Sequence, residues 1–326
     1  MPQPELLVRV IRSGLEESVH FGHVAVSDAD GRTVARAGDP DRRIFSRSSM
    51  KPLQAAVSMS VAGEEDLTLA EIAVMCASHN GESVHVQTVE RLLRRAGLEF
   101  DALRCPPGWP LDPEAMGSAG RPRPELHNCS GKHAGKLLAS TRAEWNLERY
   151  LDPDHPIQQR ILSAVLHTTD QERVDVGVDG CGAPVHGMPL AKMALLYARL
   201  SDPERVGDLG TFVLRATTAM VAEPYLVAGR DRLDTAVMEA APTVMVKVGA
   251  EGLVCAAALG EGTGVAVKVS DGSARAAGPA LIEVLRQLGV LDDVQVEKLR
   301  AHARPDVLGG GRPVGELEPV FTLART

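Results

Sequence analysis

A serine and a lysine three positions apart are the first residues in this chain that could do chemistry. They are Ser48 and Lys51, in the run Ser48-Ser49-Met50-Lys51, at the start of a stretch that reads as a helix. Residues three apart lie on one helix face, so the amine can reach the hydroxyl. A desolvated amine has a lowered pKa and can take the hydroxyl proton, which makes the serine a nucleophile. The alternative is a helix N-cap followed by a surface lysine.

Two further patterns follow in the chain. Ser78-His79-Asn80 has the form S-x-N, and Lys247-Val248-Gly249 has the form K-x-G inside an apolar, β-branched run. A lysine in a strand is poorly placed for burial without a partner, so Lys247 either faces solvent or has a role. In this order the three patterns are similar to the S-x-x-K, S-D-N and K-T-G set of serine β-lactamases and penicillin-binding proteins. The middle residues differ and the first spacing is shorter, so the similarity is one of arrangement.

Two Gly-rich polar segments contain cysteines that could bind a metal. One runs from His127 to Lys136 and includes Cys129, and the other runs from Val178 to Pro184 and includes Cys181. Two thiols with His and Asp nearby suggest a soft metal such as zinc. There is no C-x-x-C spacing, and the alternative is two small turn cysteines. An odd total of five cysteines argues against a disulfide framework.

Composition excludes several classes of function. Lys plus Arg number 35 and Asp plus Glu 43, for a formal charge of −8, and only 3% of the 326 residues are aromatic. An acidic chain with few stacking side chains is a poor partner for nucleic acid or an anionic membrane. No apolar run approaches a membrane span, and the first residues lack a secretory core. We therefore expect a cytoplasmic protein.

The hydrophobic pattern predicts the elements that must position these residues. Strands are expected at 6–11, 19–27 and 32–37, then a helix at 46–61 and a mostly helical region over 67–240. Residues 105–123 form a Pro- and Gly-rich loop. Strands follow at 243–248, 253–259 and 264–270, with a helix at 281–288 and a closing strand at 319–323. This order predicts one α+β domain over 1–326, with an antiparallel sheet from both chain ends (about 1–66 and 241–326) and a helical region inserted at about 67–240.

Three segments carry a resemblance to a known family. The runs 46–52, 127–135 and 178–185 resemble the bacterial asparaginase II family of the rhizobial, thermolabile type, and the resemblance extends from about Leu7 to Pro319. It implies a serine-β-lactamase-like fold and hydrolysis of L-asparagine, a small-molecule substrate, to L-aspartate and ammonia. It also implies a homodimer.

The resemblance also implies roles for particular residues. It pairs Ser48 with Lys51 and Ser78 with Lys247, although Lys268, in a similar apolar strand, is an alternative second lysine. It implies one zinc ion per chain, held by Cys129, Lys132, Cys181 and a water, which would tune the site rather than act as a Lewis acid. The substrate-binding residues would be Arg47, Asn80, His133 and Asp179.

Other functions remain open at this point. A penicillin-binding or β-lactamase activity fits the arrangement, but such targets lie outside the cytoplasm. A glutaminase differs by one methylene in its substrate, which a pocket discriminates by only about 1–3 kcal/mol. A zinc-dependent binding or sensor protein is a different class, in which the two cysteines would be the functional residues. A sensor would lose its function without metal, whereas an enzyme of the implied kind would keep much of its structure and some activity.

Overall fold

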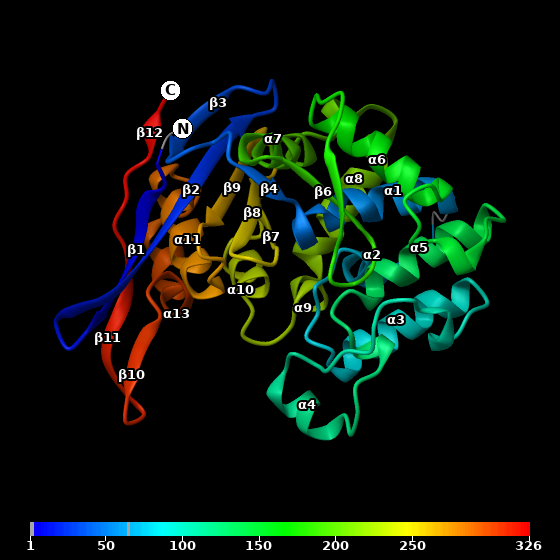
Figure 1. Cartoon of the computed structure of the whole chain (residues 1–326), viewed down its shortest axis with the longest axis horizontal. Helices are drawn as coiled ribbons and strands as arrows, with labels where there is room; N and C mark the ends of the chain where they lie inside the picture. Colours follow the sequence, from blue (N-terminus) through cyan, green and yellow to red (C-terminus); the bar gives the residue numbers. More distant parts are fainter. Residues whose placement is uncertain (1–2, 64–65) are drawn as a thin grey trace. The chain divides into compact units, whose positions relative to one another are not determined.

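Both ends of the chain contribute strands to one antiparallel sheet. A computed structural model describes residues 3–63 and 66–326. Within these residues, nine strands form the sheet, with the main path β10-β11-β1-β2-β9-β8-β7 (Figure 1) and β3 paired with both β2 and β12. The strands are β1 Glu5–Arg12, β2 Leu15–Asp28, β3 Thr33–Ala37, β7 Val244–Val248, β8 Leu253–Ala258, β9 Thr263–Val269, β10 Asp306–Gly309, β11 Arg312–Pro319 and β12 Ala324–Arg325. The prediction of an α+β fold with a sheet from both chain ends is confirmed.

The C-terminal part of the sheet differs from its prediction. The prediction of a strand at 319–323 is wrong, because the strand in this region, β11, ends at Pro319. It pairs with β1, with Pro319 opposite Val8. The strand before it, β10, is joined to β11 by Gly310 and Gly311, whose φ angles are +57° and +76°. Two residues with positive φ make the tight turn that matches strand twist. The glycine run is therefore a hairpin turn, and its flanking residues are the strands.

The described chain divides into two compact units. Unit 1 comprises Met1–Ser49, Met188–Asp202 and Ala236–Thr326, and unit 2 comprises Met50–Gly187 and Pro203–Thr235. Unit 1 holds the sheet, and Gly264 of β9 allows one helix to approach it closely, since a Cβ there would lie 2.1 Å from the Ala194 carbonyl oxygen. Besides the sheet strands, the elements of unit 1 are β4 Arg43–Phe45, η1 Arg47–Met50 at its border, α7 Leu190–Ser201, α10 Leu233–Ala240 across its border, η6 Ala274–Ala276, α11 Ala277–Gln287, α12 Asp293–Lys298 and α13 Arg300–Ala303.

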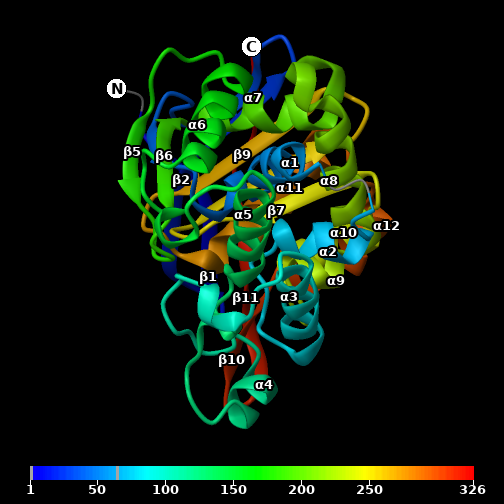
Figure 2. The ribbon, with the colours of Figure 1, turned by 90° about the vertical axis from the view of Figure 1, so that its right-hand side faces the viewer.

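Unit 2 is built around helix α1, which packs against α5, α6 and α8 (Figure 2). Helix α1 ends at Gly63, whose left-handed φ of +64° lets its N–H bond to the Met59 carbonyl. The elements of unit 2 are α1 Lys51–Ala62, α2 Leu69–Met75, α3 Ser83–Arg95, η2 Phe100–Ala102, α4 Pro113–Ser118, η3 Pro124–Leu126, α5 Ser130–Arg142, η4 Leu147–Arg149, α6 Pro156–Thr168, β5 Asp175–Val178, β6 Pro184–Pro189, η5 Pro203–Leu209, α8 Gly210–Ala222 and α9 Pro224–Val227.

The helical middle of the chain also contains elements that its pattern did not predict. The region 67–240, predicted to be mostly helical, also contains the strands β5 and β6, which pair as an antiparallel hairpin. Their turn contains Gly182, with φ +84°, and its Asp179 N–H donates to the Ala183 carbonyl. The predicted loop 105–123 contains the short helix α4. Within residues 3–63 and 66–326, no helix is both long and apolar enough to cross a bilayer.

Candidate active site

The predicted nucleophile lies in a short 3-10 turn at the border of unit 1. Ser48 is half-buried within η1, and Arg47 just before it has φ +44°. A non-glycine residue in the left-handed region is strained, and such strain is concentrated at functional sites. The next turn begins at Lys51, the first residue of α1. Ser48 and Lys51 therefore lie in two consecutive helical elements, η1 and α1.

The residue after Ser48 connects this turn to the edge strand of the sheet. The hydroxyl of Ser49 donates to the carbonyl of Lys247 on β7, at 3.0 Å. The hydroxyl of Tyr197, on α7, donates to the Ser49 carbonyl at 2.8 Å. All three side chains are buried. These contacts fix the backbone of the serine turn against the strand that carries the K-x-G motif.

The two candidate second lysines have different surroundings. Lys247 is fully buried, and its amine donates to the Val248 carbonyl at 3.0 Å. Lys268, on β9, is only partly buried, and its amine donates to the backbone carbonyls of Glu251 and Val269. The deeper burial of Lys247 favours it as the lysine with a chemical role.

Unit 2 holds a direct serine–lysine contact. The Lys51 amine is fully buried and donates to the Ser78 hydroxyl at 2.9 Å and to the Ala77 carbonyl. Burial lowers the pKa of Lys51, the charges of Cys129 and Cys181 partly opposing it. A Lys51–Ser78 contact was not predicted from the sequence. The pairings of Ser48 with Lys51 and of Ser78 with Lys247 stay predictions.

An arginine that the sequence did not single out orients the S-x-N motif. Arg232 donates through Nη1 to the Asn80 Oδ1 at 2.9 Å and to the Ser78 carbonyl at 3.3 Å. The amide nitrogen of Asn80 donates to the Arg230 carbonyl at 3.0 Å. Asn80 is therefore held at both ends of its side chain. No local signal could identify Arg232, because it lies 152 residues from Asn80 in the chain.

The histidine in the S-x-N motif has a structural role. His79 is fully buried, and its Nδ1 accepts from the Gly81 N–H at 3.1 Å. The Ser130 hydroxyl donates to the Glu125 carbonyl, so the His79 Nε2 donates to the Ser130 oxygen, at 2.9 Å. Burial places the pKa of His79 well below its usual value. His79 is therefore a neutral ring that fixes the chain between Ser78 and Asn80.

The first turns of α5 carry the metal-ligand candidates and pack closely on α2 (Figure 2). Gly131 makes this possible, since a Cβ there would lie 2.0 Å from the Val74 carbonyl oxygen. One turn later, a Cβ at Gly135 would lie 2.7 Å from the Met75 side chain. These glycines explain why the segment around Lys132 is Gly-rich. They bring α5 against the end of α2, just before Ser78.

The three predicted zinc ligands meet inside unit 2. The Lys132 amine lies 3.0 Å from the Cys181 sulfur, and the Cys129 thiol also hydrogen-bonds to Cys181. That hydrogen bond and the adjacent Lys132 cation hold the pKa of Cys181 well below its usual range. Burial opposes the charged form of Lys132, but the cysteine sulfurs outweigh burial and raise its pKa. All three side chains are buried.

This donor set fits a zinc ion only if the lysine takes part. Among the described residues, no three His, Cys, Asp or Glu side chains form a metal-binding group. Cys129 and Cys181 supply two soft sulfur donors, and Lys132 supplies the nitrogen that lies against one of them. Two thiolates and one nitrogen leave one tetrahedral position for water, the pattern of an open zinc site. The residues therefore fit the expected group.

Two predicted substrate-binding residues lie beside this cluster. The His133 Nδ1 accepts from the Tyr150 hydroxyl at 2.7 Å, because that oxygen itself accepts from the Arg104 N–H. Burial lowers the pKa of His133 to about 4, and a hydrogen bond with the Cys181 side chain opposes this shift. Asp179 is half-buried, and its carboxylate lies 3.9 Å from the Cys181 sulfur. His133 is thus a neutral ring that interacts with both Tyr150 and Cys181.

A second buried lysine on α5 was also not predicted as a notable residue. Lys136 is fully buried, and its amine donates to the Gln158 Oε1 at 3.2 Å. Burial and the nearby Lys132 cation lower its pKa to about 7. Its position one turn after Lys132 puts two amines on the same helix face. The cluster therefore contains one amine that favours its charged form and one that readily loses its proton.

Comparison with known proteins gives one family and several distant structures. The family model described as L-asparaginase II matches residues 8–319. A beta-lactamase from Mycobacterium bovis shares 15% identity at a TM-score of 0.44, over 82% of this chain and 94% of that one. Mglu in its glutamate form shares 14% identity at a TM-score of 0.48, over 86% of this chain and 61% of that one. The Bacillus subtilis glutaminase YbgJ, in covalent complex with 5-oxo-L-norleucine, shares 12% identity at a TM-score of 0.37, over 83% of this chain and 89% of that one. The comparison with curated proteins gave no match.

Proposed function

The chain belongs to the L-asparaginase II family and is an amidohydrolase; from this premise we propose that it hydrolyses L-asparagine to L-aspartate and ammonia. The observation that carries the proposal is the buried hydrogen bond from Lys51 to Ser78. A buried amine with a lowered pKa is the base that a serine nucleophile needs. Ser48, one helical turn before that amine, is the nucleophile.

The reaction proceeds through an acyl-enzyme. Lys51 takes the hydroxyl proton of Ser48 as the serine oxygen attacks the side-chain amide carbon. Backbone N–H groups hold the oxyanion. Lys51 passes the proton through its neighbour Ser78 to the amide nitrogen, the C–N bond breaks, and ammonia leaves. Water then attacks the aspartyl ester, gives a proton to Lys51, and the same proton restores the Ser48 hydroxyl as L-aspartate leaves.

The second lysine supports the proton transfer through Ser78. We assign this role to Lys247, because its side chain is fully buried. The Ser49 hydroxyl bonds to the backbone carbonyl of Lys247, and the Tyr197 hydroxyl bonds to the carbonyl of Ser49. This assignment rests on the family's pairing of a second serine with a second lysine.

Substrate recognition uses opposite charges for the two ends of asparagine. The Arg47 cation pairs with the α-carboxylate, and the Asp179 carboxylate pairs with the α-ammonium. His133, neutral at pH 7, contributes an uncharged polar ring to the same site. Asn80 is held by Arg232 and the Arg230 carbonyl, so its amide is fixed in orientation before substrate binds. Such preorganisation is what a selective polar site requires.

The zinc ion in this proposal is held by Cys129, Lys132, Cys181 and a water. When bound, it would supply a fixed positive charge that orients the polar groups around it. Lys132 must lose its proton to bind the metal, and Cys181 is already the more acidic thiol. His133 follows Lys132 directly, so the same helical turn holds the metal ligand and a substrate-binding ring.

The test is ammonia release by the purified protein with L-asparagine and, separately, with L-glutamine. Ser48→Ala should abolish release, while Ser60→Ala, which removes a hydroxyl from α1 that bonds only within its own helix, should not. Circular dichroism checks that both variants fold. Normal turnover by folded Ser48→Ala would remove Ser48 as the nucleophile. Ammonia release from L-glutamine but not from L-asparagine would support an amidohydrolase whose substrate is L-glutamine.

A further inference from the structure

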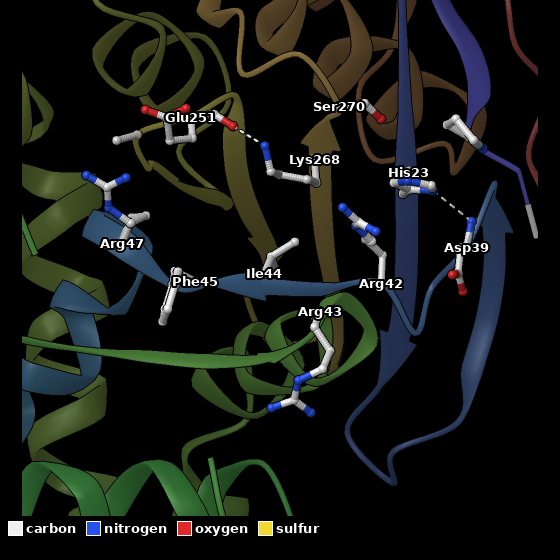
Figure 3. A pocket seen from close by; sticks show the side chains of 12 residues that line it. His23, Asp39, Arg42, Arg43, Ile44, Phe45, Arg47, Glu251, Lys268 and Ser270 are labelled. Carbon is white, nitrogen blue, oxygen red and sulfur yellow. Dashed lines mark hydrogen bonds between the residues drawn. The ribbon is translucent and has the colours of Figure 1, made fainter. Parts of the chain in front are cut away.

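A basic cavity of about 520 Å³ lies within unit 1, and Arg47 is the lining residue that the proposed reaction also uses. Its lining comes from β2, from the segment leading into β4 and η1, from the β7–β8 turn and from β9 (Figure 3). A volume of this size is typical of pockets that bind small molecules. Separate chain segments therefore converge on a space that could hold a ligand.

The cavity carries positive charge in an acidic protein. Four cations line it, and two carboxylates oppose them, so the formal charge is +2 in a chain of net −8. The lining His23 is neutral, because its Nδ1 accepts the Asp39 N–H at 2.9 Å and burial lowers its pKa. The cations are Arg42, Arg43, Arg47 and Lys268, and the carboxylates are Asp39 and Glu251.

The cations repel one another, and the backbone holds them in place. Lys268 donates only to the backbone carbonyls of Glu251 and Val269. Burial lowers the pKa of Lys268, Arg42 and Arg47 lower it further, and Glu251 and Asp271 oppose them. The carbonyl of Arg42 accepts from the Leu190 N–H at 3.0 Å, which fixes its backbone against α7. An anion in the cavity would relieve this repulsion without moving the main chain.

The orientations of the side chains separate the residues that could share a ligand. Figure 3 shows that Arg42, Arg47 and Lys268 extend on one side of β4, whereas Arg43 points to the other side. Guanidinium groups pair with carboxylate and phosphate oxygens through two parallel hydrogen bonds, and a lysine adds a point charge. Arg42 and Lys268, the two of these cations that the proposed reaction does not use, match a ligand with two negative charges.

We propose that this cavity binds a small dianion with carboxylate or phosphate oxygens, held by Arg42 and Lys268 next to Arg47. Arg47 immediately precedes Ser48 in η1. The bound anion therefore contacts the segment that carries the nucleophile. The inference concerns binding alone and stands whether or not the chain hydrolyses asparagine.

The test is isothermal titration calorimetry of the full chain with inorganic phosphate and, separately, with succinate, without asparagine. We expect one anion per chain, with affinity that falls as sodium chloride is added. Arg42→Gln and Lys268→Met should each weaken binding about tenfold or more, because each removes a charge-assisted contact. Arg312→Gln removes an exposed arginine from β11, outside the cavity, and should leave the dissociation constant unchanged.

The outcomes separate the two anion sources and the two proposals. Binding of phosphate alone assigns a tetrahedral oxyanion, and binding of succinate alone assigns a dicarboxylate. The proposal is overturned if the folded protein binds neither phosphate nor succinate. It is also overturned if Arg312→Gln weakens anion binding as much as Arg42→Gln and Lys268→Met do. Ser48→Ala should bind the anion as the unaltered chain does. A chain that binds the anion but releases no ammonia would keep this proposal and reject the proposed hydrolysis.

Discussion

Lys51 is the residue on which the proposed acid–base chemistry depends most. Its amine is fully buried and bonded to Ser78. Lys51→Met keeps the length of the side chain and removes the base, so kcat should fall about 10²- to 10⁴-fold. Ammonia release measures the rate. Lys192→Met, on the less buried face of α7, is the control and should leave kcat unchanged. Wild-type turnover by a folded Lys51→Met protein would contradict the role of Lys51 as base.

Protonation of Lys51 should determine how kcat/KM falls toward low pH. Only the uncharged amine can accept the Ser48 proton, so kcat/KM should rise with pH as Lys51 loses its proton. Burial lowers the pKa of Lys51, so this rise should lie below the pH range of an ordinary lysine. A profile measured between pH 5 and pH 10, at constant ionic strength, tests it. A rise confined to the ordinary lysine range would contradict the assignment.

Lys136 should destabilise the fold in a pH-dependent way. Its pKa is about 7 in the folded chain, against a reference value of 10.5. Between these values the unfolded chain binds more protons, so the free energy of unfolding rises with pH, by at most about 1.4 kcal/mol per pH unit. Lys136→Met removes this dependence and should be the more stable protein at pH 7. Urea unfolding at pH 7 and pH 9 measures the free energy of unfolding of both proteins. The prediction is contradicted if the extra stability of Lys136→Met is as large at pH 9 as at pH 7.

At the scale of elements, the contact of α5 with α2 depends on one missing side chain. Gly131→Ala places a Cβ 2.0 Å from the Val74 carbonyl oxygen, a clash that needs a backbone shift. We expect a loss of about 1–3 kcal/mol, the usual cost of overpacking. Gly117→Ala, in α4, meets no atom within 4 Å and is the matched control. Thermal unfolding of both compares them, and equal melting temperatures would show that the helices do not pack this tightly.

The elements divide into those that local pattern predicts and those that it does not. The runs 243–248, 253–259 and 264–270 are apolar and bounded by turn residues, and they match β7, β8 and β9 to within one or two residues. The short strands β5 and β6 lie in a helical region and were missed. Their pairing depends on the turn at Gly182, which no periodicity signals.

The candidate site divides in the same way. Spacing and motifs pointed to Ser48, Lys51, Ser78 and Lys247, because each sits in a short run with its neighbours. Arg232, Tyr150 and Tyr197 were missed, because each acts through contacts with residues distant in the chain. The Lys51–Ser78 bond is of the same kind, since it joins the start of one helix to the loop after another.

At the scale of the whole molecule, the chain should be a homodimer with one zinc ion per chain. Native mass spectrometry gives both numbers in one measurement. Cys181→Ala removes the thiol beside Lys132 and Cys129 and should remove the zinc. Cys105→Ala removes a buried thiol that bonds to the Pro124 carbonyl and should keep the metal. Unchanged zinc in Cys181→Ala would reject the ligand set, and a monomeric mass would reject the dimer.

The pairing of β1 with β11 has a consequence for how this chain acquires its structure. Val8 lies opposite Pro319, so the two partners are made more than 300 residues apart during synthesis. Until β11 emerges from the ribosome, β1 presents an unpaired edge, which is where strands of nascent chains aggregate. Most of unit 2 is a continuous stretch, Met50–Gly187, so that part does not depend on strands made at the end of the chain. Yield on overexpression should therefore depend on how long that one edge stays open, and slower synthesis with chaperones should raise it.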